Sequence, residues 1–329
     1  MSKTDMMPGY LSIGFGAAMS IVREPHSFAD MAHNTIQCGD SIELMKSLPD
    51  NSAHLILSDI PYGIGLDDWD VLHANSNSAY GGASPAQSKA GAVFKKRGKP
   101  INGWSEADKR IPYEYQEWCA KWASEWLRVL KPGGSVMIFA GRRFSHRAIC
   151  ALEDAGFNFR DLLGWTRPRA VHRAQRLSIV FDRRNNKVSS EFWDGWRVGN
   201  LKPTFEPIIW AFKPYRITIA DNVLEHQLGA YNQDKFEQYF GTKDNIFECG
   251  MEPGEGGLHP AQKPVRLMEA LIDLVTIPGQ LVIDPFAGSG STGVAASKLG
   301  RKFILMESNP DICETARKRI MLPKQHQLI

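Results

Sequence analysis

The sequence predicts an α/β fold in which a doubly wound, mostly parallel β-sheet carries helices on both faces. Short apolar runs typical of buried strands alternate with longer runs that have helical spacing, which is the pattern of such folds. Two of the strand-like runs end directly in turns that carry acidic side chains. The 329 residues, of which 43% are hydrophobic, suffice for a large core in one catalytic domain with insertions.

Each element of this fold is predicted from its own apolar pattern. The first two thirds of the chain supply strands at 35–38 and 55–58, a helix at 115–129, a strand at 135–139, a helix at 143–152 and a strand at 207–212. The last part supplies a helix at 265–275, a strand at 281–283, a helix at 293–299 and a strand at 302–306. A Leu-Lys-Pro-Gly-Gly turn at 130–134 is expected before the 135–139 strand.

The segment 284–292, Asp-Pro-Phe-Ala-Gly-Ser-Gly-Ser-Thr, lies between a predicted strand and a predicted helix. Gly288 and Gly290 permit a tight turn that a ligand can approach, and the helix that follows begins with free N–H groups. Glu307 ends the next strand about twenty residues later, where a carboxylate can accept hydrogen bonds from ribose hydroxyls. This arrangement suits a cofactor that carries an anionic group, although an ordinary strand-turn-helix with a surface acid has the same pattern.

The tetrad Asp59-Ile60-Pro61-Tyr62 follows the apolar run 54–58 and therefore lies at the carboxyl end of a strand. Ligands bind at that edge of an open parallel sheet. Asp59 offers a hydrogen-bond acceptor, Pro61 keeps the backbone extended with a carbonyl before it, and Tyr62 supplies a flat ring. These groups suit a flat heterocycle held by its amino group, but a simple strand-to-loop turn has the same composition.

A third motif, His-Pro-Ala-Gln-Lys-Pro at 259–264, lies between the other two. With these motifs in this order, the chain resembles the beta class of S-adenosylmethionine-dependent DNA amino-methyltransferases, whose motifs are D/S-P-P-Y, H-P-T-Q-K-P and D-P-F-x-G-S-G-T. The Gly39-Asp40 pair and the 130–134 turn are shared as well. Ile60 and Ala261 depart from the family, which usually has proline and threonine there. Ile60 keeps its extended bias because a proline follows it.

The resemblance implies a seven-stranded methyltransferase sheet, circularly permuted so that the catalytic half precedes the cofactor half. It divides the chain into an N-terminal extension (1–33), a catalytic half with a basic loop at 73–103 (34–165), a basic and aromatic DNA-recognition insertion (166–204), the end of the catalytic half with a short acidic connector (205–258), and a cofactor-binding half (259–329). No function is predicted for residues 1–33.

The resemblance also assigns roles to residues. Asp59 and the Ile60 carbonyl would accept the two N–H groups of the target amine, so that the nitrogen lone pair faces the methyl group. Tyr62, after Pro61, would stack on a base flipped out of the duplex. S-adenosylmethionine would be held by Asp40, His259, Lys263, Asp284, Phe286, Gly288, Gly290, Thr292 and Glu307. No metal and no covalent intermediate are expected.

The charge is unevenly distributed, although the net charge is only +3. Ten lysines and arginines face four acids in 160–202, whereas eight acids face two lysines in 221–258. We therefore expect double-stranded DNA to be bound mainly by the segment 160–202, which includes most of the insertion, and by residues 89–99 of the basic loop. The bland alternatives are a solvated linker for the loop and a half-buried subdomain for the insertion. The candidate DNA-binding residues are Lys95, Lys96, Arg97, Arg167, Arg169, Arg173, Arg176, Arg183 and Arg184.

The five cysteines are scattered, with no C-x-x-C pair, which favours a reducing compartment and disfavours a zinc site. None follows a proline, so the Pro-Cys nucleophile of the carbon-5 cytosine methyltransferases is missing. The apolar segment 10–22 is too short to span a bilayer and makes a poor signal peptide. The sequence thus predicts a cytoplasmic protein without a membrane partner.

The predicted function is methyl transfer to adenine N6 in DNA, with site-directed or relaxed specificity. Adenine is favoured because an aspartate heads the tetrad more often in adenine enzymes of the family. Cytosine N4 is the alternative within the class. Transfer to RNA or protein amides and a catalytically silent DNA-binding scaffold are further alternatives. A homodimer and a cognate restriction enzyme stay open as partners.

Overall fold

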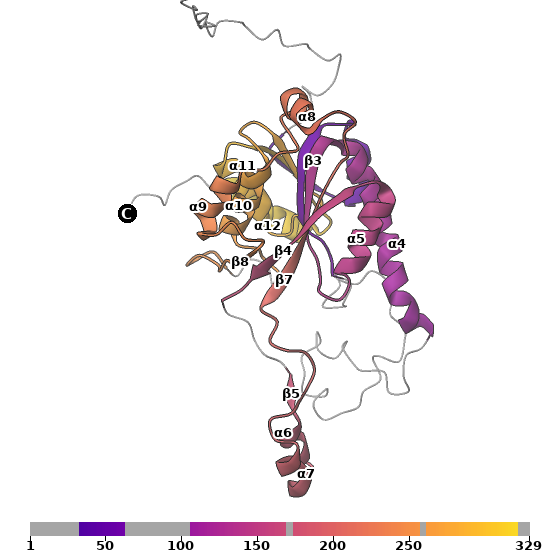
Figure 1. Ribbon diagram of the computed structural model, residues 1–329, viewed down its shortest axis with the longest axis vertical. Helices are drawn as coiled ribbons and strands as arrows, with labels where there is room; N and C mark the ends of the chain where they lie inside the picture. The colour runs from indigo at the N-terminus through magenta and orange to yellow at the C-terminus, as the bar shows by residue number, and fades with distance from the viewer. Residues whose placement is uncertain (1–32, 63–105, 169–173, 257–260, 322–329) are drawn as a thin grey trace, which may run out of the picture. The chain divides into compact units, whose positions relative to one another are not determined.

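The computed structural model describes residues 33–62, 106–168, 174–256 and 261–321. Its main feature is an eight-stranded sheet that lies between two groups of helices, with α4 and α5 on one face and α10 and α11 on the other (Figure 1). The helices are α1 (Ser41–Lys46), α4 (Glu106–Val129), α5 (Ser145–Ala155), α6 (Leu177–Asp182), α7 (Lys187–Phe192), α8 (Ile219–His226), α9 (Gln233–Phe240), α10 (Val265–Val275), α11 (Ser291–Lys298) and α12 (Pro310–Met321).

The strands of the main sheet follow the order β1-β10-β9-β2-β3-β7-β4-β8. Among the described strands of this main sheet, β7 alone runs antiparallel to its neighbours, which confirms the mostly parallel, doubly wound sheet. The strands are β1 (Thr35–Cys38), β2 (Ala53–Asp59), β3 (Leu130–Phe139), β4 (Asn158–Thr166), β7 (Phe205–Phe212), β8 (Ile246–Glu248), β9 (Leu281–Asp284) and β10 (Lys302–Glu307).

The sheet differs from the expected one by its eighth strand. Strand β8 comes from the predicted acidic connector and pairs with β4 at the sheet edge. It has three residues, of which Phe247 alone is buried, so its apolar pattern is too short to identify a strand. The connector also contains the short helices α8 and α9. Elements of this length are stabilised mainly by tertiary packing, which a local pattern does not reveal.

The predicted turn at 130–134 appears as an irregularity inside β3. Ala53 of β2 pairs with Leu130, whereas Leu55 pairs with Ser135, so the residues between them bulge out of the ladder. Gly133 adopts a φ of +79°, which glycine accepts without strain. The bulge keeps the strand continuous while the regular ladder begins only at Ser135.

The circular permutation is visible in the strand order. Strands β9 and β10, which are late in the chain, lie between the early strands β1 and β2. The chain continues from β9 toward β10 on one side and from β2 toward β3 on the other. A crevice opens between the carboxyl ends of two strands whose connections diverge in this way. The topology therefore predicts a ligand site where β2 and β9 end.

The core is divided between the two faces of the sheet. Leu55 and Leu57 are fully buried in the cluster that contains α10, and Ile56 between them faces the side covered by α4 and α5. Trp122 and Trp126 on α4 are also fully buried. These side chains fix the strand ends that carry the polar groups of the site. No described helix is both long and apolar enough to cross a membrane.

Candidate active site

The predicted catalytic and cofactor motifs meet at one edge of the sheet. Asp59, Asp284 and Glu307 are the last residues of β2, β9 and β10. Strand β1 ends just before Gly39 and Asp40. Because β7 runs in the opposite direction, its start, with Glu206 as its second residue, reaches the same edge. Segments separated by more than two hundred positions therefore contribute to a single site.

Asp59 is held by Lys263, which belongs to the 259–264 motif. The Lys263 ammonium donates to Asp59 Oδ2 at 2.5 Å and lies 3.1 Å from Glu206 Oε1. It also reaches the Tyr62 hydroxyl at 3.4 Å. The sequence predicted Lys263 as a cofactor-binding residue, and its charged group lies between two carboxylates beside the tetrad.

Glu206 is a site residue that the sequence reasoning missed. Its side chain is buried and accepts a hydrogen bond from the Tyr62 hydroxyl. Its other oxygen, Oε2, forms an ion pair with Arg167 at 3.1 Å. A single acid within the apolar run Phe-Glu-Pro-Ile-Ile-Trp-Ala-Phe was the signal for it, since a buried acid in a strand needs partners.

The burial of these charges shifts their pKa values. Burial raises the pKa of Asp59 to about 6, against the opposing effect of Lys263 and with the help of Glu206. Burial acts in the same direction on Glu206, but Lys263, Tyr62 and Arg167 prevail and lower its pKa. Burial disfavours the charge of Lys263, yet the two carboxylates together raise its pKa. Lys263 and Glu206 thus form a charged pair at neutral pH.

The hydroxyl of Tyr62 stays protonated in this environment. Burial, followed by the nearby charges of Asp59 and Glu206, raises the pKa of Tyr62 well above its usual value. The backbone of Gly141 also packs closely against Tyr62, since a Cβ atom added to this glycine would lie only 2.9 Å from Tyr62 Cβ. This contact restricts the position of the ring. Gly141 is therefore a second residue that the sequence reasoning missed, and a lone glycine after a strand gave no signal of this contact.

The second oxygen of Asp59 is left without a partner in the described part of the chain. Oδ1 is buried, and no hydrogen-bond donor among the described residues reaches it. An unpaired buried oxygen of this kind costs on the order of 1–3 kcal/mol or more when it is charged. Such a cost is typical of an acceptor that is kept ready for a ligand.

Asp284, in contrast, has partners on both oxygens. Oδ1 accepts from the Ser58 hydroxyl at 2.5 Å and from the Phe286 N–H at 3.1 Å. Oδ2 accepts from the Thr292 hydroxyl. Burial raises the pKa of Asp284 to about 6, although all three donors favour its charged form. The carboxylate thus ties together the two ends of the glycine-rich turn and the neighbouring strand β2.

Glu307 holds the middle of the same turn. Its Oε2 accepts from the Gly288 N–H at 3.0 Å, and its Oε1 accepts from the Asn309 N–H at 2.9 Å. Gly288 has a φ of +50°, and a Cβ there would meet no described atom within 4 Å, so the space beside it is open. Gly290, with a φ of +82°, precedes α11 as its N-cap. The turn therefore leaves room for a ligand.

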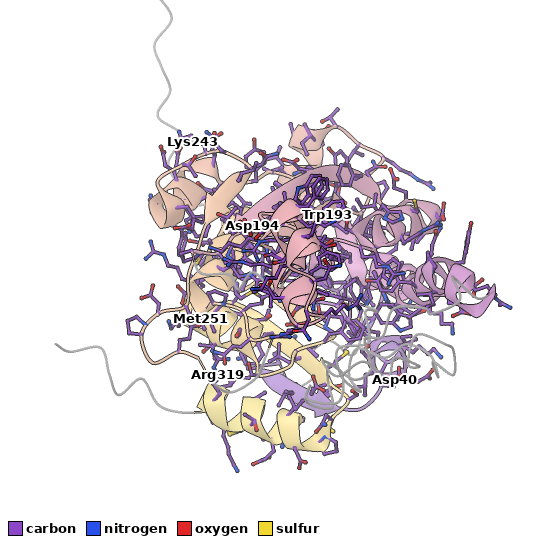
Figure 2. The ribbon with its side chains drawn as sticks, turned by 90° about the horizontal axis from the view of Figure 1, so that it is seen from below. Asp40, Trp193, Asp194, Lys243, Met251 and Arg319 are labelled. Atoms are coloured by element: carbon purple, nitrogen blue, oxygen red, sulfur yellow. The ribbon has the colours of Figure 1, made fainter. Side chains whose placement is uncertain are left out.

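Asp40 lies at the start of α1, where it caps the helix (Figure 2). Its Oδ1 accepts from the N–H groups of Ile42 and Glu43 at 2.8 and 3.2 Å. This cap fixes the carboxylate at the rim of the site. His259, the remaining predicted cofactor residue, lies outside the described residues.

A cavity of about 370 Å³ joins the catalytic and the glycine-rich motifs. Its size lies in the range typical of small-molecule sites. Ile60 is buried, and Tyr62 is absent from the described lining. The lining includes the predicted residues Asp40, Asp59, Pro61, Lys263, Asp284, Phe286, Gly288, Thr292 and Glu307.

Trp118 of α4 also lines this cavity, and the sequence reasoning did not identify it. Its ring lies 5.8 Å from that of Phe286 and 5.9 Å from that of Trp122. Tryptophans at 118, 122 and 126 recur at a spacing of four residues, which is typical of one face of a helix. That pattern is equally typical of core packing, so it could not place one ring at the site.

The position of the Lys263 segment is set by polar contacts from α11 and from Glu255, and Arg319 holds the serines of the neighbouring turn. The Ser291 hydroxyl of α11 donates to the Lys263 carbonyl at 2.9 Å. The carboxylate of Glu255 accepts from the Val265 N–H at the start of α10. Arg319 of α12, labelled in Figure 2, donates to the Ser289 and Ser291 hydroxyls at 3.1 and 3.0 Å. The 261–264 segment and the glycine-rich turn are thus braced together.

The predicted DNA-binding residues are distributed differently. Arg167 is paired with Glu206 and lies over the Trp165 ring at 5.4 Å. Arg176, Arg183 and Arg184 lie exposed in the insertion, which forms α6, α7 and a small sheet of β5 (Gln175–Arg176) and β6 (Arg197–Val198). The others, Lys95, Lys96, Arg97, Arg169 and Arg173, lie outside the described residues.

The insertion carries three neighbouring aromatic side chains, two of them exposed and Trp193 half-buried, which we call the aromatic cluster: Phe192, Trp193 and Trp196. Phe192 is 75% exposed and Trp196 is 60% exposed. Trp193, which follows α7 and is labelled in Figure 2, has its ring edge-to-face with both other rings, at 5.3 Å between ring centroids. Large rings exposed together are typical of an interaction surface.

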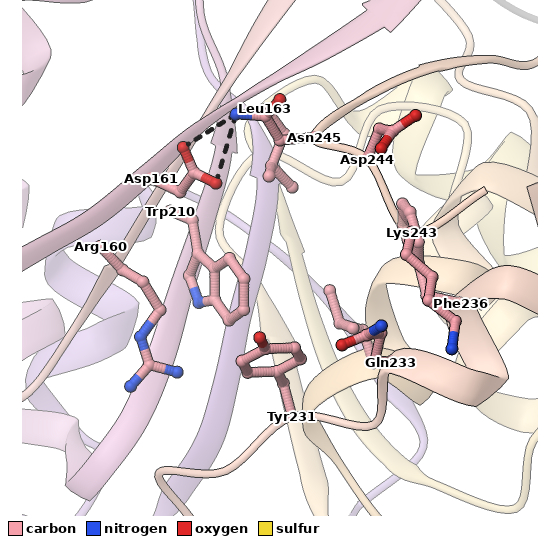
Figure 3. A pocket seen from close by; sticks show the side chains of 11 residues that line it. Arg160, Asp161, Leu163, Trp210, Tyr231, Gln233, Phe236, Lys243, Asp244 and Asn245 are labelled. Atoms are coloured by element: carbon pink, nitrogen blue, oxygen red, sulfur yellow. Dashed lines mark hydrogen bonds between the residues drawn. The ribbon is translucent and has the colours of Figure 1, made fainter.

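A second cavity, of about 180 Å³, lies away from these motifs (Figure 3). Arg160, near the start of β4, stacks on Trp210 at 5.0 Å and on Phe212 at 4.6 Å. Tyr231 and Lys243 line other sides of this cavity. Among the described residues, none of those predicted for catalysis or for cofactor binding lines it.

Comparisons with known proteins all identify similarity to methyltransferases. A family model described as DNA methylase matches residues 53–318. Type II methyltransferase M.HindIII of Haemophilus influenzae is 51% identical over 294 residues, which cover 87% of this chain and 95% of that protein. Type II methyltransferase M.HinfI of Haemophilus influenzae is 26% identical over 299 residues, which cover 87% of this chain and 68% of that protein.

Solved structures share the fold. The cytosine-N4-specific PvuII DNA methyltransferase superposes with a TM-score of 0.58 at 19% identity and covers 88% of this chain and 86% of its own. The Thermus thermophilus protein TTHA0409, complexed with S-adenosyl-L-methionine, superposes with a TM-score of 0.53 at 20% identity and covers 87% and 92%. At these identities the similarity concerns the architecture.

Proposed function

The chain belongs to the N6/N4 family of DNA methylases, and we propose that it transfers the methyl group of S-adenosylmethionine to adenine N6 in double-stranded DNA. The observation that carries the proposal is the unpaired Asp59 Oδ1. It lies in a residue that lines the same cavity as the glycine-rich turn. An acceptor for an amine and a space for a cofactor therefore meet at one edge of the sheet.

S-adenosylmethionine fits the cavity, which offers acceptor oxygens for its ribose hydroxyls and open space beside the glycine-rich turn. When bound, this cofactor supplies a methyl group on a positively charged sulfur. Glu307, at the end of β10, retains acceptor capacity for ribose hydroxyls because each of its oxygens accepts only one hydrogen bond from the described residues. The open space at Gly288 lets the ligand approach the backbone. The residues that would hold the cofactor are Asp40, Asp284, Phe286, Gly288, Gly290, Thr292 and Glu307, with His259 as a prediction from the motif.

The tetrad activates the amine. The lone pair of an exocyclic amino group is delocalised into its ring, so the nitrogen is a poor nucleophile. Asp59 Oδ1 accepts one N–H and the Ile60 carbonyl accepts the other, which favours a tetrahedral nitrogen with its lone pair directed at the methyl group. With the cofactor bound, the N–C bond would form as the C–S bond breaks, which would leave a neutral thioether, and the proton lost by the nitrogen would pass to Asp59 or to water. Tyr62 stacks on the base, which must leave the duplex to reach the cavity.

Adenine is the proposed base because the tetrad begins with aspartate. Cytosine N4 presents a similar amine to the same acceptors, so it is the outcome to be tested against adenine. The assay is to incubate the protein with unmethylated duplex DNA and labelled S-adenosylmethionine, and to digest the product to nucleosides. N6-methyladenine supports the proposal, whereas N4-methylcytosine or the lack of any labelled nucleoside contradicts it.

The insertion is the proposed DNA-binding surface. Arg176, Arg183 and Arg184 are exposed beside the aromatic cluster, which suits contacts to phosphates together with stacking on an unstacked step. Lys95, Lys96, Arg97, Arg169 and Arg173 belong to the same proposal through their positions in the sequence. Experiments with DNA and with the full chain would identify the recognition sequence and would test for a homodimer and for a cognate restriction enzyme.

Replacing Arg176, Arg183 and Arg184 together by alanine should weaken DNA binding and reduce the slope of log Kd against log salt by up to about three, because each phosphate contact contributes close to one. The transfer rate at saturating DNA should change little. Binding is measured by fluorescence anisotropy across a salt series. Arg317→Ala, which removes an arginine paired with Glu314 on α12, is the control that should leave the slope unchanged. An unchanged slope in the triple variant would refute this surface.

A further inference from the structure

Glu206 lies behind the catalytic tetrad at the centre of a group of polar contacts. It is buried, and its Oε1 accepts from the Tyr62 hydroxyl and contacts the Lys263 ammonium at 3.1 Å. Its Oε2 pairs with Arg167 at 3.1 Å. It does not appear in the described lining of the cavity, so it acts on the site through its neighbours.

We infer that Glu206 is a positioning residue for methyl transfer, which holds Tyr62 and Lys263 in place around Asp59, and that Arg167 links this acid to the insertion. The inference rests on the proposed function, since it concerns the same site. It adds a role for two residues that lie outside the three sequence motifs.

The first argument concerns the orientation of Asp59. Lys263 contacts one oxygen of Asp59, Oδ2, and leaves Oδ1 without a partner among the described residues. Lys263 has a second carboxylate to satisfy, because Glu206 Oε1 lies on another side of the ammonium. Two anchors hold the ammonium better than one, so Glu206 keeps Lys263 on Oδ2 and away from Oδ1. Without it, the flexible lysine side chain could contact both oxygens of Asp59 and occupy the acceptor that the target amine needs.

The second argument concerns the ring of Tyr62. A tyrosine that stacks on a flipped base must present its ring in a fixed plane. Glu206 accepts from the hydroxyl at the far end of the ring, and Gly141 packs against the ring near Cβ. The ring is thus held at both ends. Buried hydrogen bonds to a charged acceptor are among the stronger ones in proteins.

The third argument concerns the insertion, which begins after β4 and ends before β7. At its neck, Trp165 pairs with Glu206 and Thr166 pairs with Phe205 across the two antiparallel strands. The Arg167 N–H donates to the Thr204 carbonyl at 2.9 Å, which extends the pairing by one step. The Arg167 side chain is 43% exposed, so its guanidinium faces both Glu206 and solvent. A ligand bound on the insertion at Arg167 can therefore act on Glu206 through this one side chain.

The charges around Asp59 give this inference a distinctive readout. Lys263, Glu206 and Tyr62 face Asp59, and Asp284 lies on the neighbouring strand. The negative charge of Glu206 raises the pKa of Asp59, and Arg167 lowers the pKa of Glu206 itself. Glu206→Gln should therefore lower the pKa of Asp59 and move the acidic limb of the rate to lower pH. Arg167→Gln should move that limb to higher pH, because Lys263 and Tyr62 keep Glu206 ionised and the effect of its negative charge on Asp59 is then no longer offset by Arg167.

The experiment measures transfer to duplex DNA under saturating conditions between pH 5 and 8, together with the Kd values for S-adenosylmethionine and for DNA. Glu206→Gln should reduce kcat about 10-fold to 100-fold, the size expected for misplaced reacting groups, while the Kd for the cofactor stays within about twofold. Glu206→Asp should recover part of the rate. Asp273→Asn is the control, because Asp273 is also buried and ion-paired, with Arg301 and Lys235, but on α10. It should alter stability without moving the pH profile.

An active Glu206→Gln with the pH profile of the unaltered protein overturns the inference. So does a profile that moves in the same direction in Glu206→Gln and Arg167→Gln. If Glu206→Gln fails to fold, Arg167→Gln decides alone, since a shift to higher pH supports the link and an unmoved limb refutes it. Failure of the proposed function is distinct, because the unaltered protein would then methylate no adenine at all.

Discussion

Asp59, which is half-buried, and Asp284, which is buried, end neighbouring strands, and removal from water raises the pKa of each to about 6. Their hydrogen bonds differ. Asp284 accepts from Ser58, Thr292 and the Phe286 N–H, so both of its oxygens have partners. Asp59 receives Lys263 on one oxygen, whereas the other is buried and meets no donor in the described part of the chain. The comparison teaches that the satisfied acid builds the turn, whereas the unsatisfied one is the acceptor that the proposed function assigns to the substrate.

The largest effect is expected at Asp59. Asp59→Ala should reduce the methyl transfer rate by about 100-fold to 1,000-fold or more, the range found when a group that stabilises developing charge is removed. S-adenosylmethionine binding should persist, because the glycine-rich turn is untouched. Rapid-quench transfer assays and calorimetric titration of the cofactor measure the two quantities. Asp59→Asn is the matched control for shape and should also be impaired, since its amide nitrogen would face either Lys263 or the amine. Full activity in either variant would remove Asp59 from the reaction.

Asp284 should show the converse. Asp284→Asn places an amide nitrogen among three donors, which costs on the order of 1–3 kcal/mol for each buried group left unpaired. The glycine-rich turn should loosen, the Kd for S-adenosylmethionine should rise about tenfold, and the melting temperature should fall. Calorimetry and thermal unfolding test these expectations. A variant that binds the cofactor normally but fails in transfer would mean that the two acids do not divide the work in this way.

The smallest expected effect concerns pH, which should change the transfer rate through Asp59 and the free energy of unfolding through Asp284. With saturating cofactor and DNA, the rate should fall as the pH drops below about 6, to about one tenth at pH 5, because a protonated Asp59 carboxyl is a weaker acceptor and presents an O–H donor to the amine. For Asp284, the folded-state pKa lies above 3.8, so the folded protein binds the extra proton between pH 6 and 4. Its contribution to the free energy of unfolding therefore decreases as the pH rises through that window. Asp284→Asn should flatten this change, measured by denaturant unfolding at pH 4.5 and 6.5, and leave the acidic limb of the rate in place.

The sequence predicted the parts of the site that lie within short contiguous motifs. Asp59, Lys263 and the glycine-rich turn were identified because their spacing along the chain carries the information. Strand β9 and helix α10 were predicted almost to the residue, because both are apolar and buried. The mostly parallel sheet followed from the same alternation of patterns.

The parts that were missed depend on contacts between distant segments. Ser58 looks like one more residue of a strand, and only the register of β2 against β9 brings it to Asp284. Glu206 reaches Tyr62 and Lys263 because β7 runs in the opposite direction. Trp118 has the same spacing as the core tryptophans around it. In each of these cases the side chain's partner comes from another element, so no local pattern could identify it.

The strand order has a consequence for how the protein is made. Strands β1 and β2 leave the ribosome early, but the partners that lie between them, β10 and β9, are completed only when residue 307 has been synthesised. Leu281, for example, donates its N–H to His54 Nδ1, 227 positions earlier. Until then the nascent chain holds apolar strands with an open edge, a state prone to wrong pairing with other chains. The tetrad and the glycine-rich turn come together only when β9 pairs with β2. A partly synthesised chain therefore lacks the site, and methylation begins only with chains whose sheet is complete.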